Sequence, residues 1–528
     1  MPPGTMSLAR TVDTVVRALL TVIGLVMKPI LAVVFSVIYD WRSAKVPPVQ
    51  EDLCLKSATE LAKLIRTRKV KAVDVMEAFI NRVGIVNPMV NAVTATRYEA
   101  AILEAEEVDT KLDSGHLDSQ YSQENAPFLG VPTSVKEAFA LKGLRHASGL
   151  VKRKNKIATF DAEVVARLKK AGAIPYILTN VSELCMWYES ANYLNGRTCN
   201  AYDTSRIVGG SSGGEACIIS TAGAVMGVGS DIGGSIRMPA FFNGVFGHKA
   251  SRGLVPNEGQ YPIATGGERA LLSTGPLCRY AEDILPLLKV FAGPESSHKA
   301  KLDDQVDLSK LKIYSMLDDG GSLFVSPVDK QLKEAQCKVE KYLEEKLKLK
   351  VERVNIHRMR YGLEVWTAKM NSGGGKKFAE FMSDDNGRVN CVVELLKWLV
   401  GCSQHTLPAI SLGIVESFSM PETDKKFLKV FDKLELDITK LLANDGILLY
   451  PSHPKLAPYH NEPILYPFNF AYTGVFNTLG LPVTQCPLGL SKDGHPLGLQ
   501  VVTGMNNDRF TIALAREIEK GFGGWVKP

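Results

Sequence analysis

Residues 209–240 read GGSSGGEACIISTAGAVMGVGSDIGGSIRMPA, with two clusters of glycine and serine around an apolar stretch. Glycine and serine make up all of its first six residues and six of the nine from Gly227 to Ser235. Such clusters let backbone N–H groups converge and let the chain approach a ligand closely. The apolar, helix-like pattern between the two clusters predicts a short helix that returns the chain. We therefore expect Ser211 and Ser235 to meet.

The sequence upstream supplies a basic residue in a strand-like context. Lys136 lies in GVPTSVKEAF, a short segment that alternates as a strand does. Further apolar runs at residues 173–178 and 224–228 alternate with helical patterns. This alternation favours an α/β fold with a partly parallel sheet. No clean linker interrupts residues 50–520, so the simplest prediction is one large domain.

Helical patterns are expected on either side of that sheet. The capping box formed by Ser57 and Glu60 predicts a helix that starts at residue 58. Apolar periodicity predicts further helices over residues 74–83, 98–112 and 330–349.

Composition excludes several classes of function. The chain has 528 residues, and its 62 basic and 56 acidic side chains give a net charge of only +6, too dispersed to indicate nucleic-acid binding. Its nine cysteines include no CxxC pair, and its nine histidines show no HxxxH or HExxH spacing. We therefore expect no metal site, and free thiols in place of a disulfide framework.

The glycine-rich stretch resembles the signature of the amidase signature family. The resemblance extends over about residues 52–520 and includes LGLPVTQCPLGL and GHPLGLQVVTG near the C-terminus. It implies a large mixed β-sheet covered by helices, with neither a metal nor an organic cofactor. The signature positions that agree are Gly209, Gly210, Ser211, Ser212, Gly213, Gly214, Gly227, Gly229, Asp231, Gly233, Ser235, Ile236, Arg237 and Pro239.

The resemblance also implies roles for individual residues. Ser235 in GGSIR matches the nucleophile that is acylated, Ser211 matches a bridging serine whose peptide bond is cis, and Lys136 matches the base. The oxyanion hole is implied to consist of the backbone N–H groups of Ile232, Gly233, Gly234 and Ser235. Two departures from the family pattern, Thr133 and Ala250, lie outside the three catalytic positions.

Elementary chemistry explains why an amidase needs such a set. An amide is a poor electrophile with a poor leaving group, so the serine needs a base and the departing amine needs a proton. A lysine acts as a base only when it is neutral, which burial brings about by lowering its pKa. A bridging serine carries the proton between Lys136 and Ser235, so that one amine serves as base and then as acid.

Other residues of the stretch are expected to support the site. Asp231 and Arg237 flank the nucleophile and are predicted to form a charge pair that fixes the oxyanion loop. Ser212 is predicted to support the site by hydrogen bonding, and Glu215 to cap the helix. The alternative is an α/β-hydrolase in which Ser212, the serine of a G-x-S-x-G match, is the nucleophile. That motif follows a buried strand, whereas residues 202–206 are polar.

Large apolar and aromatic residues near these motifs are candidates for a substrate pocket. They are Met186, Trp187 and Tyr188 together with Phe241 and Phe242. Each is equally compatible with an ordinary place in the core.

The N-terminus differs from the rest of the chain. Residues 18–39 read ALLTVIGLVMKPILAVVFSVIY, long enough as a helix to span about 30 Å of hydrocarbon. Lys28 and Pro29 interrupt the segment, so it is either a single-pass anchor or a bent pair of helices in one leaflet. Arginines or lysines flank the segment on both sides, so their distribution does not indicate which end faces which side of the membrane. We expect a membrane anchor at residues 1–45, a linker at 46–51 and the catalytic domain at 52–528.

Within the family the chain resembles the membrane-bound hydrolases of fatty acid amides. This implies a lipid amide substrate, a membrane location and no nucleic-acid partner, and leaves open whether copies form a homo-oligomer. One alternative is an amidase for small or peptidic amides, or a glutamine-hydrolysing subunit of an amidotransferase. A further alternative is that the protein is not an enzyme but an inactive membrane carrier or scaffold for lipids.

Overall fold

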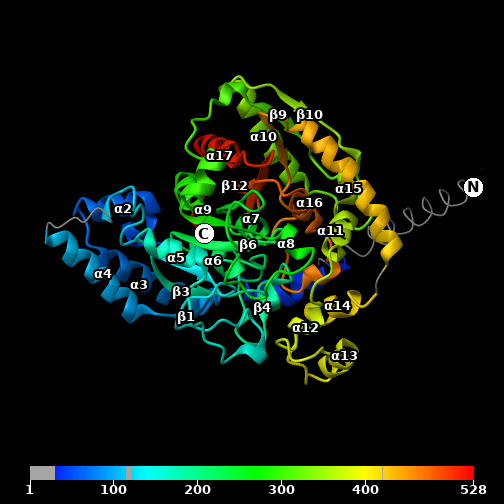
Figure 1. The fold of residues 1–528 in the computed structure, drawn as a ribbon, viewed down its shortest axis with the longest axis horizontal. Coiled ribbons are helices and arrows are strands. Elements are labelled where there is room, and N and C mark those ends of the chain that lie inside the picture. Colours follow the sequence, from blue (N-terminus) through cyan, green and yellow to red (C-terminus); the bar gives the residue numbers. More distant parts are fainter. Residues whose placement is uncertain (1–29, 32, 115–120, 419) are drawn as a thin grey trace, which may run out of the picture.

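A computed structural model describes residues 30–31, 33–114, 121–418 and 420–528. Its centre is an eleven-stranded sheet in the order β1-β3-β2-β6-β8-β7-β12-β13-β11-β9-β10 (Figure 1). The strands are β1 (Val93–Thr96), β2 (Pro132–Lys136), β3 (Ile174–Thr179), β6 (Met226–Asp231), β7 (Phe246–Lys249), β8 (Ser273–Cys278), β9 (Lys312–Ser315), β10 (Val351–Arg353), β11 (Gly446–Tyr450), β12 (Val483–Leu490) and β13 (Pro496–Thr503). β4 (Ala191–Asn192) and β5 (Gly196–Arg197) form a separate two-stranded sheet.

The sheet is mixed, as the resemblance implies. β2 runs parallel to both β3 and β6, and β9 runs parallel to β10 and β11, whereas the remaining neighbours are antiparallel. Val135 of β2 pairs with Val228 of β6. Because β2 and β6 are parallel, their carboxyl ends meet at one edge of the sheet. This places Lys136, the last residue of β2, beside the segment that leaves β6 after Asp231.

Helices cover the sheet and extend beyond it at both ends (Figure 1). α3 and α4 pack together beside β3, α17 packs on β12 and β13, and α13 packs on α14. The helices are α2 (Ala58–Arg66), α3 (Ala72–Val90), α4 (Tyr98–Asp113), α5 (Glu163–Lys170), α6 (Gly213–Ser220), α7 (Arg237–Phe242), α8 (Glu268–Leu271), α9 (Ile284–Lys299), α10 (Lys330–Lys346), α11 (Gly362–Asn371), α12 (Phe378–Phe381), α13 (Cys391–Leu399), α14 (Leu407–Val415), α15 (Pro421–Leu441), α16 (Ala471–Leu479) and α17 (Asp508–Phe522).

The predicted elements are confirmed, with shifted ends. The Ser57 side chain accepts a hydrogen bond from the Glu60 N–H and caps α2. α3 extends past the predicted residue 83 because its buried stripe continues through Val86 and Val90. The strand expected from residue 224 begins at Met226, since residues 221–223 form a turn.

The signature stretch lies at the centre of the molecule. Every residue from 208 to 250 is buried except Ile232, which is half-buried. Small residues account for this, because α6 and β6 leave no room for longer side chains: a Cβ on Gly214 would lie 2.4 Å from the Asn180 nitrogen. The glycines therefore serve close packing as well as the geometry of the site.

Much of the predicted membrane segment lies outside the described residues, which begin at Ile30. Residues 33–39 are helical. Tyr39 packs against Tyr459, and the Asn461 side-chain amide donates a hydrogen bond to the Tyr39 hydroxyl. Val33 and Val37 are exposed. Within the part of the chain that the structure covers, no helix is both long enough and apolar enough to cross a membrane.

Candidate active site

Lys136 ends β2 with its side chain turned into the protein and fully buried. Its Nζ lies 2.8 Å from the Ser211 Oγ, 3.0 Å from the Ser230 Oγ and 3.3 Å from the Ser230 carbonyl oxygen. A neutral amine fits these contacts, because it donates two hydrogens and keeps one lone pair. A neutral amine that directs both hydrogens at Ser230 would leave its lone pair for the Ser211 hydroxyl, which could then donate to Nζ.

Burial decides the protonation state of this lysine. Removal from water lowers the pKa of Lys136, and the partial opposition of Cys185, Asp231 and Glu215 does not reverse that direction. The structure places no carboxylate within ion-pair distance of Nζ among the residues it describes. A buried amine without a salt bridge has little to stabilise its charged form.

The first glycine cluster presents Ser211 to that amine. The Gly210–Ser211 peptide bond is cis, as the resemblance implies. The Ser190 hydroxyl holds this turn by donating to the Gly209 carbonyl while it accepts from the Gly213 N–H. α6 then begins directly after Ser212, which confirms the predicted helix between the two glycine clusters.

The second cluster turns tightly around the Asp231 carboxylate. Asp231 accepts hydrogen bonds from the N–H groups of Gly234 (2.7 Å) and Ile236 (3.0 Å). The N–H of Gly234, which the resemblance assigns to the oxyanion hole, is therefore engaged by Asp231 instead. The N–H groups of Ile232, Gly233 and Ser235 have no acceptor among the described residues. These three N–H groups are unengaged in the described structure, and their role as an oxyanion hole stays a prediction.

The predicted pair between Asp231 and Arg237 is confirmed, and both side chains are fully buried. The guanidinium contacts the two carboxylate oxygens at 2.9 and 3.0 Å. Burial opposes the charge of Asp231, but the Arg237 charge outweighs it and holds the pKa of this carboxyl well below its usual range. Arg237 also donates to the side chains of Asn477 and Gln500, so α16 and β13 are tied to the nucleophile turn.

Two residues from the C-terminal half orient the oxyanion loop, and sequence reasoning missed both. Trp366 of α11 donates its indole N–H to the Ile232 carbonyl oxygen at 2.8 Å. The Thr473 hydroxyl of α16 donates to the Gly233 carbonyl oxygen at 2.6 Å. Fixing each carbonyl fixes the plane of its peptide, and with it the direction of the next N–H. No local pattern around either residue signals this role.

Glu215 is a buried carboxyl behind Lys136, not the simple helix cap that its position in the sequence suggests. Its two oxygens lie 2.6 Å from the Ser134 Oγ and 2.5 Å from the Thr179 Oγ1. Burial raises the pKa of Glu215 to about 7, although Ser134, Thr179 and the nearby Lys136 charge act in the other direction. The proton on this group and the charge on Lys136 are therefore coupled near neutral pH.

This coupling predicts a shifted pH profile for Glu215→Gln. As the pH rises past about 7, wild-type Glu215 gains a negative charge, which raises the pKa of Lys136 and delays loss of its proton. Glutamine keeps the hydrogen bonds but never ionises, so Lys136 becomes neutral at lower pH. We expect the acid limb of kcat/KM to move down by about one pH unit. Exposed Glu352 provides the matched control, Glu352→Gln, whose profile should not move. A Glu215→Gln profile identical to wild type would refute the coupling.

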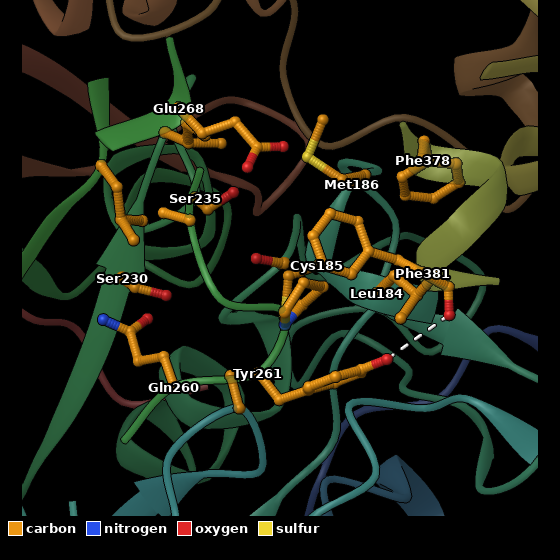
Figure 2. Close-up of a pocket in the computed structure, with 16 residues that line it drawn as sticks. Leu184, Cys185, Met186, Ser230, Ser235, Gln260, Tyr261, Glu268, Phe378 and Phe381 are labelled. Atoms are coloured by element: carbon orange, nitrogen blue, oxygen red, sulfur yellow. Dashed lines mark hydrogen bonds between the residues drawn. The ribbon is translucent and has the colours of Figure 1, made fainter. Parts of the chain in front are cut away.

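Ser211 and Ser235 open into one pocket, drawn in Figure 2. Its polar wall carries Ser230 and Gln260 beside Ser235. The opposite wall is apolar and is formed by Leu184, Met186, Tyr261, Phe378 and Phe381. The pocket thus joins a nucleophilic hydroxyl to a hydrophobic surface.

Of the aromatic and apolar residues expected at the pocket, only Met186 lines it. Tyr188, Phe241 and Phe242 belong to a buried core cluster, and Trp187 packs against that cluster. Tyr261, Phe378 and Phe381 take their place. They come from loops and from a one-turn helix, where no periodic pattern marks a buried face.

The structure does not favour Ser212 as the nucleophile. No strand directly precedes Ser212 in the described chain, where residues 202–211 form turns and isolated bridges. Its N–H donates to the Ser235 carbonyl oxygen, and its hydroxyl lies 3.4 Å from the Ser230 carbonyl oxygen. Ser212 does not line the pocket. It supports the two glycine clusters against each other, as the sequence predicts.

The mixed sheet, the two glycine clusters and the buried lysine define an enzyme that hydrolyses amide bonds. The family model described as Amidase matches residues 74–512, so the chain belongs to the amidase signature family. Fatty-acid amide hydrolase 2 of Homo sapiens is 52% identical over 494 residues, covering 92% of this chain and 93% of the human protein. Fatty-acid amide hydrolase 2-A of Danio rerio is 49% identical and covers 92% of each chain. A solved structure titled "Fatty acid amide hydrolase" has a TM-score of 0.70 at 21% identity, over 91% of this chain and 87% of that chain.

Proposed function

We propose that this protein hydrolyses fatty acid amides to free fatty acids and amines through a Ser–Ser–Lys triad. The observation that carries the proposal is the pocket in which Ser235 and Ser211 face an apolar wall while the buried Lys136 contacts Ser211 from behind. The names of the two relatives that are about half identical to this chain support the same substrate class.

Acylation begins when the Ser235 Oγ attacks the amide carbon. The Ser235 proton passes to Ser211, and the Ser211 proton passes to the neutral Nζ of Lys136. The carbonyl oxygen becomes an oxyanion that accepts hydrogen bonds from the N–H groups of Ile232, Gly233 and Ser235, each worth about 3 kcal/mol where such donors have been removed. The structure records a hydrogen bond from Lys136 to Ser211 but none from Ser211 to Ser235, a contact that substrate binding is expected to tighten.

The proton transfers then proceed in the opposite direction through the same residues. Collapse of the tetrahedral intermediate breaks the C–N bond, and the proton on Lys136 returns through Ser211 to the departing nitrogen. The amine leaves, and the acyl group stays on Ser235 as an ester. Water attacks this ester with the same proton relay, which releases the fatty acid and restores the Ser235 hydroxyl.

The apolar wall favours a substrate with a long acyl chain over one with a short acyl group. Each methylene moved from water to such a wall contributes about 0.8 kcal/mol, so a hydrocarbon chain is held without polar contacts. A small or peptidic amide would leave Phe378 and Phe381 uncovered, and glutamine would place a charged group against them. The intact Lys136, Ser211 and Ser235 disfavour the inactive carrier or scaffold.

A membrane location forms part of the proposal, and one feature of the sequence and one of the structure support it. The apolar segment at residues 18–39 is one of them, and its described part exposes Val33 and Val37. The other is α13, which exposes Val392, Leu396 and Leu399. α13 packs on α14, and α14 packs on α12, which supplies Phe378 and Phe381 to the pocket. A tethered enzyme meets bilayer-concentrated substrates at high effective concentration.

The test of the substrate class is a series of primary amides with two to eighteen carbons. We expect kcat/KM of the full-length protein to rise steeply with chain length, because each added methylene contributes about 0.8 kcal/mol until the apolar wall is covered. The measurement is kcat/KM at fixed detergent, with total substrate kept below its solubility limit. A flat or falling series would exclude fatty amides and favour an amidase for small amides.

A further inference from the structure

The pocket contains one formally charged side chain, to which the proposed reaction gives no role. Glu268, the first residue of α8, lines the pocket together with Ser235. The other residues that line the pocket are apolar or uncharged, and Lys136 is not among them. In Figure 2 the Glu268 carboxylate points into the space between Ser235 and Met186.

This carboxylate is only partly satisfied by the protein. Its Oε2 accepts hydrogen bonds from the Thr265 N–H at 2.9 Å and from the Thr265 hydroxyl at 3.4 Å. Its Oε1 has no hydrogen-bond donor, and the side chain has no ion-pair partner, among the residues that the structure describes. Burial raises the pKa of Glu268, although the hydrogen bonds from Thr265 act in the other direction. A half-buried acceptor of this kind gains most from a donor that a ligand brings.

The chemistry of a fatty amide leaves one partner for Glu268. Its carbonyl oxygen is taken by the N–H groups of the Ile232–Ser235 turn, and its hydrocarbon chain cannot satisfy a carboxylate. The remaining polar part is the amine half. We infer that Glu268 selects the amine half of the substrate by accepting a hydrogen bond from a hydroxyl or ammonium group on it. This inference rests on the proposed function and extends it to the leaving group.

The inference makes a prediction about charge. An N-substituent with a cation or hydroxyl gains a charge-assisted hydrogen bond at Glu268, while one with a carboxylate meets a like charge. Three matched substrates test this: oleic acid amides of 1,2-diaminoethane, of ethanolamine and of glycine. Oleamide, which has no N-substituent, reports on any general damage to the pocket.

Glu268→Gln keeps the acceptor oxygen for Thr265 but removes the charge. We expect the ratio of kcat/KM for the aminoethyl amide to that for the glycine amide to fall by about tenfold, while oleamide changes less than about twofold. Glu268→Lys should invert the preference between the two charged substrates. Glu258→Gln removes the same charge from an exposed position outside the pocket and should leave the ratio unchanged.

The outcomes separate this inference from the proposed function. Equal loss on all four substrates in Glu268→Gln would mean a structural role and overturn the inference. An unchanged ratio would overturn it as well, while normal turnover of oleamide would leave the proposed function intact. If wild-type protein hydrolysed none of the four lipid amides, the proposed function itself would fail.

Discussion

Ser235→Ala is expected to abolish amide hydrolysis, lowering kcat by at least about 10⁴-fold. In the proposed mechanism the Ser235 Oγ forms the acyl bond, and neither Ser211 nor Ser212 is placed to replace it. Ser212 does not line the pocket, and Ser211 is held by Lys136. The measurement is turnover of a long-chain amide by the purified full-length variant.

The fold should survive this change. The Ser235 hydroxyl has no hydrogen-bond partner within the described part of the chain, and its N–H remains in alanine. Thermal unfolding of Ser235→Ala should therefore match wild type. Ser212→Ala is the control, because it also loses a hydroxyl from a glycine cluster but should retain substantial turnover. Residual hydrolysis by Ser235→Ala above that of a heat-inactivated sample would contradict the assignment.

Lys136→Ala should lower amide turnover by several powers of ten, about 10³-fold or more. In the proposed mechanism the lysine both activates Ser235 through Ser211 and returns a proton to the departing nitrogen. An ester leaving group depends less on that proton, so the loss should be smaller for the matched ester than for the amide. Wild-type activity should rise with pH through the pKa of Lys136, which burial lowers, because only the neutral amine accepts a proton.

Lys136→Arg sharpens this test. Arginine preserves a long basic side chain but stays protonated, so it cannot act as the base. The arginine variant should therefore fail nearly as severely as the alanine variant. Because the side chain is fully buried, folding of both variants is checked by thermal unfolding. Near-normal amide turnover by either folded variant at neutral pH would refute the role of Lys136.

The local parts of the site could be predicted from the sequence. Two glycine clusters joined by an apolar, helix-like stretch predict that the chain returns on itself. The 209–240 stretch therefore indicated both the helix and the proximity of Ser211 and Ser235. The strand that ends at Lys136 followed from its alternating pattern, and the parallel pairing of β2 with β6 explains why this lysine reaches Ser211. The charge pair of Asp231 and Arg237 followed from two residues that flank one tight turn.

What could not be predicted depends on contacts between distant segments. Trp366 and Thr473 lie more than 100 residues beyond the oxyanion loop, and nothing in their own neighbourhoods marks them as its supports. The use of the Gly234 N–H by Asp231 depends on backbone direction rather than on residue type. Glu215 lies in the first turn of α6, so its position in the sequence suggested a helix cap. Its burial depends on contacts with Ser134 of β2 and Thr179 of β3, which the local sequence does not indicate. Self-association stays a prediction.

The most direct test of the account is to identify the serine that reacts covalently with an active-site probe. Full-length protein is labelled with a fluorophosphonate, digested, and mapped by tandem mass spectrometry across residues 209–240, a stretch that contains both glycine clusters. The account predicts a single adduct on Ser235, lost in Ser235→Ala and prevented by prior incubation with a long-chain amide. An adduct on Ser211 or Ser212 in the wild-type protein would contradict it.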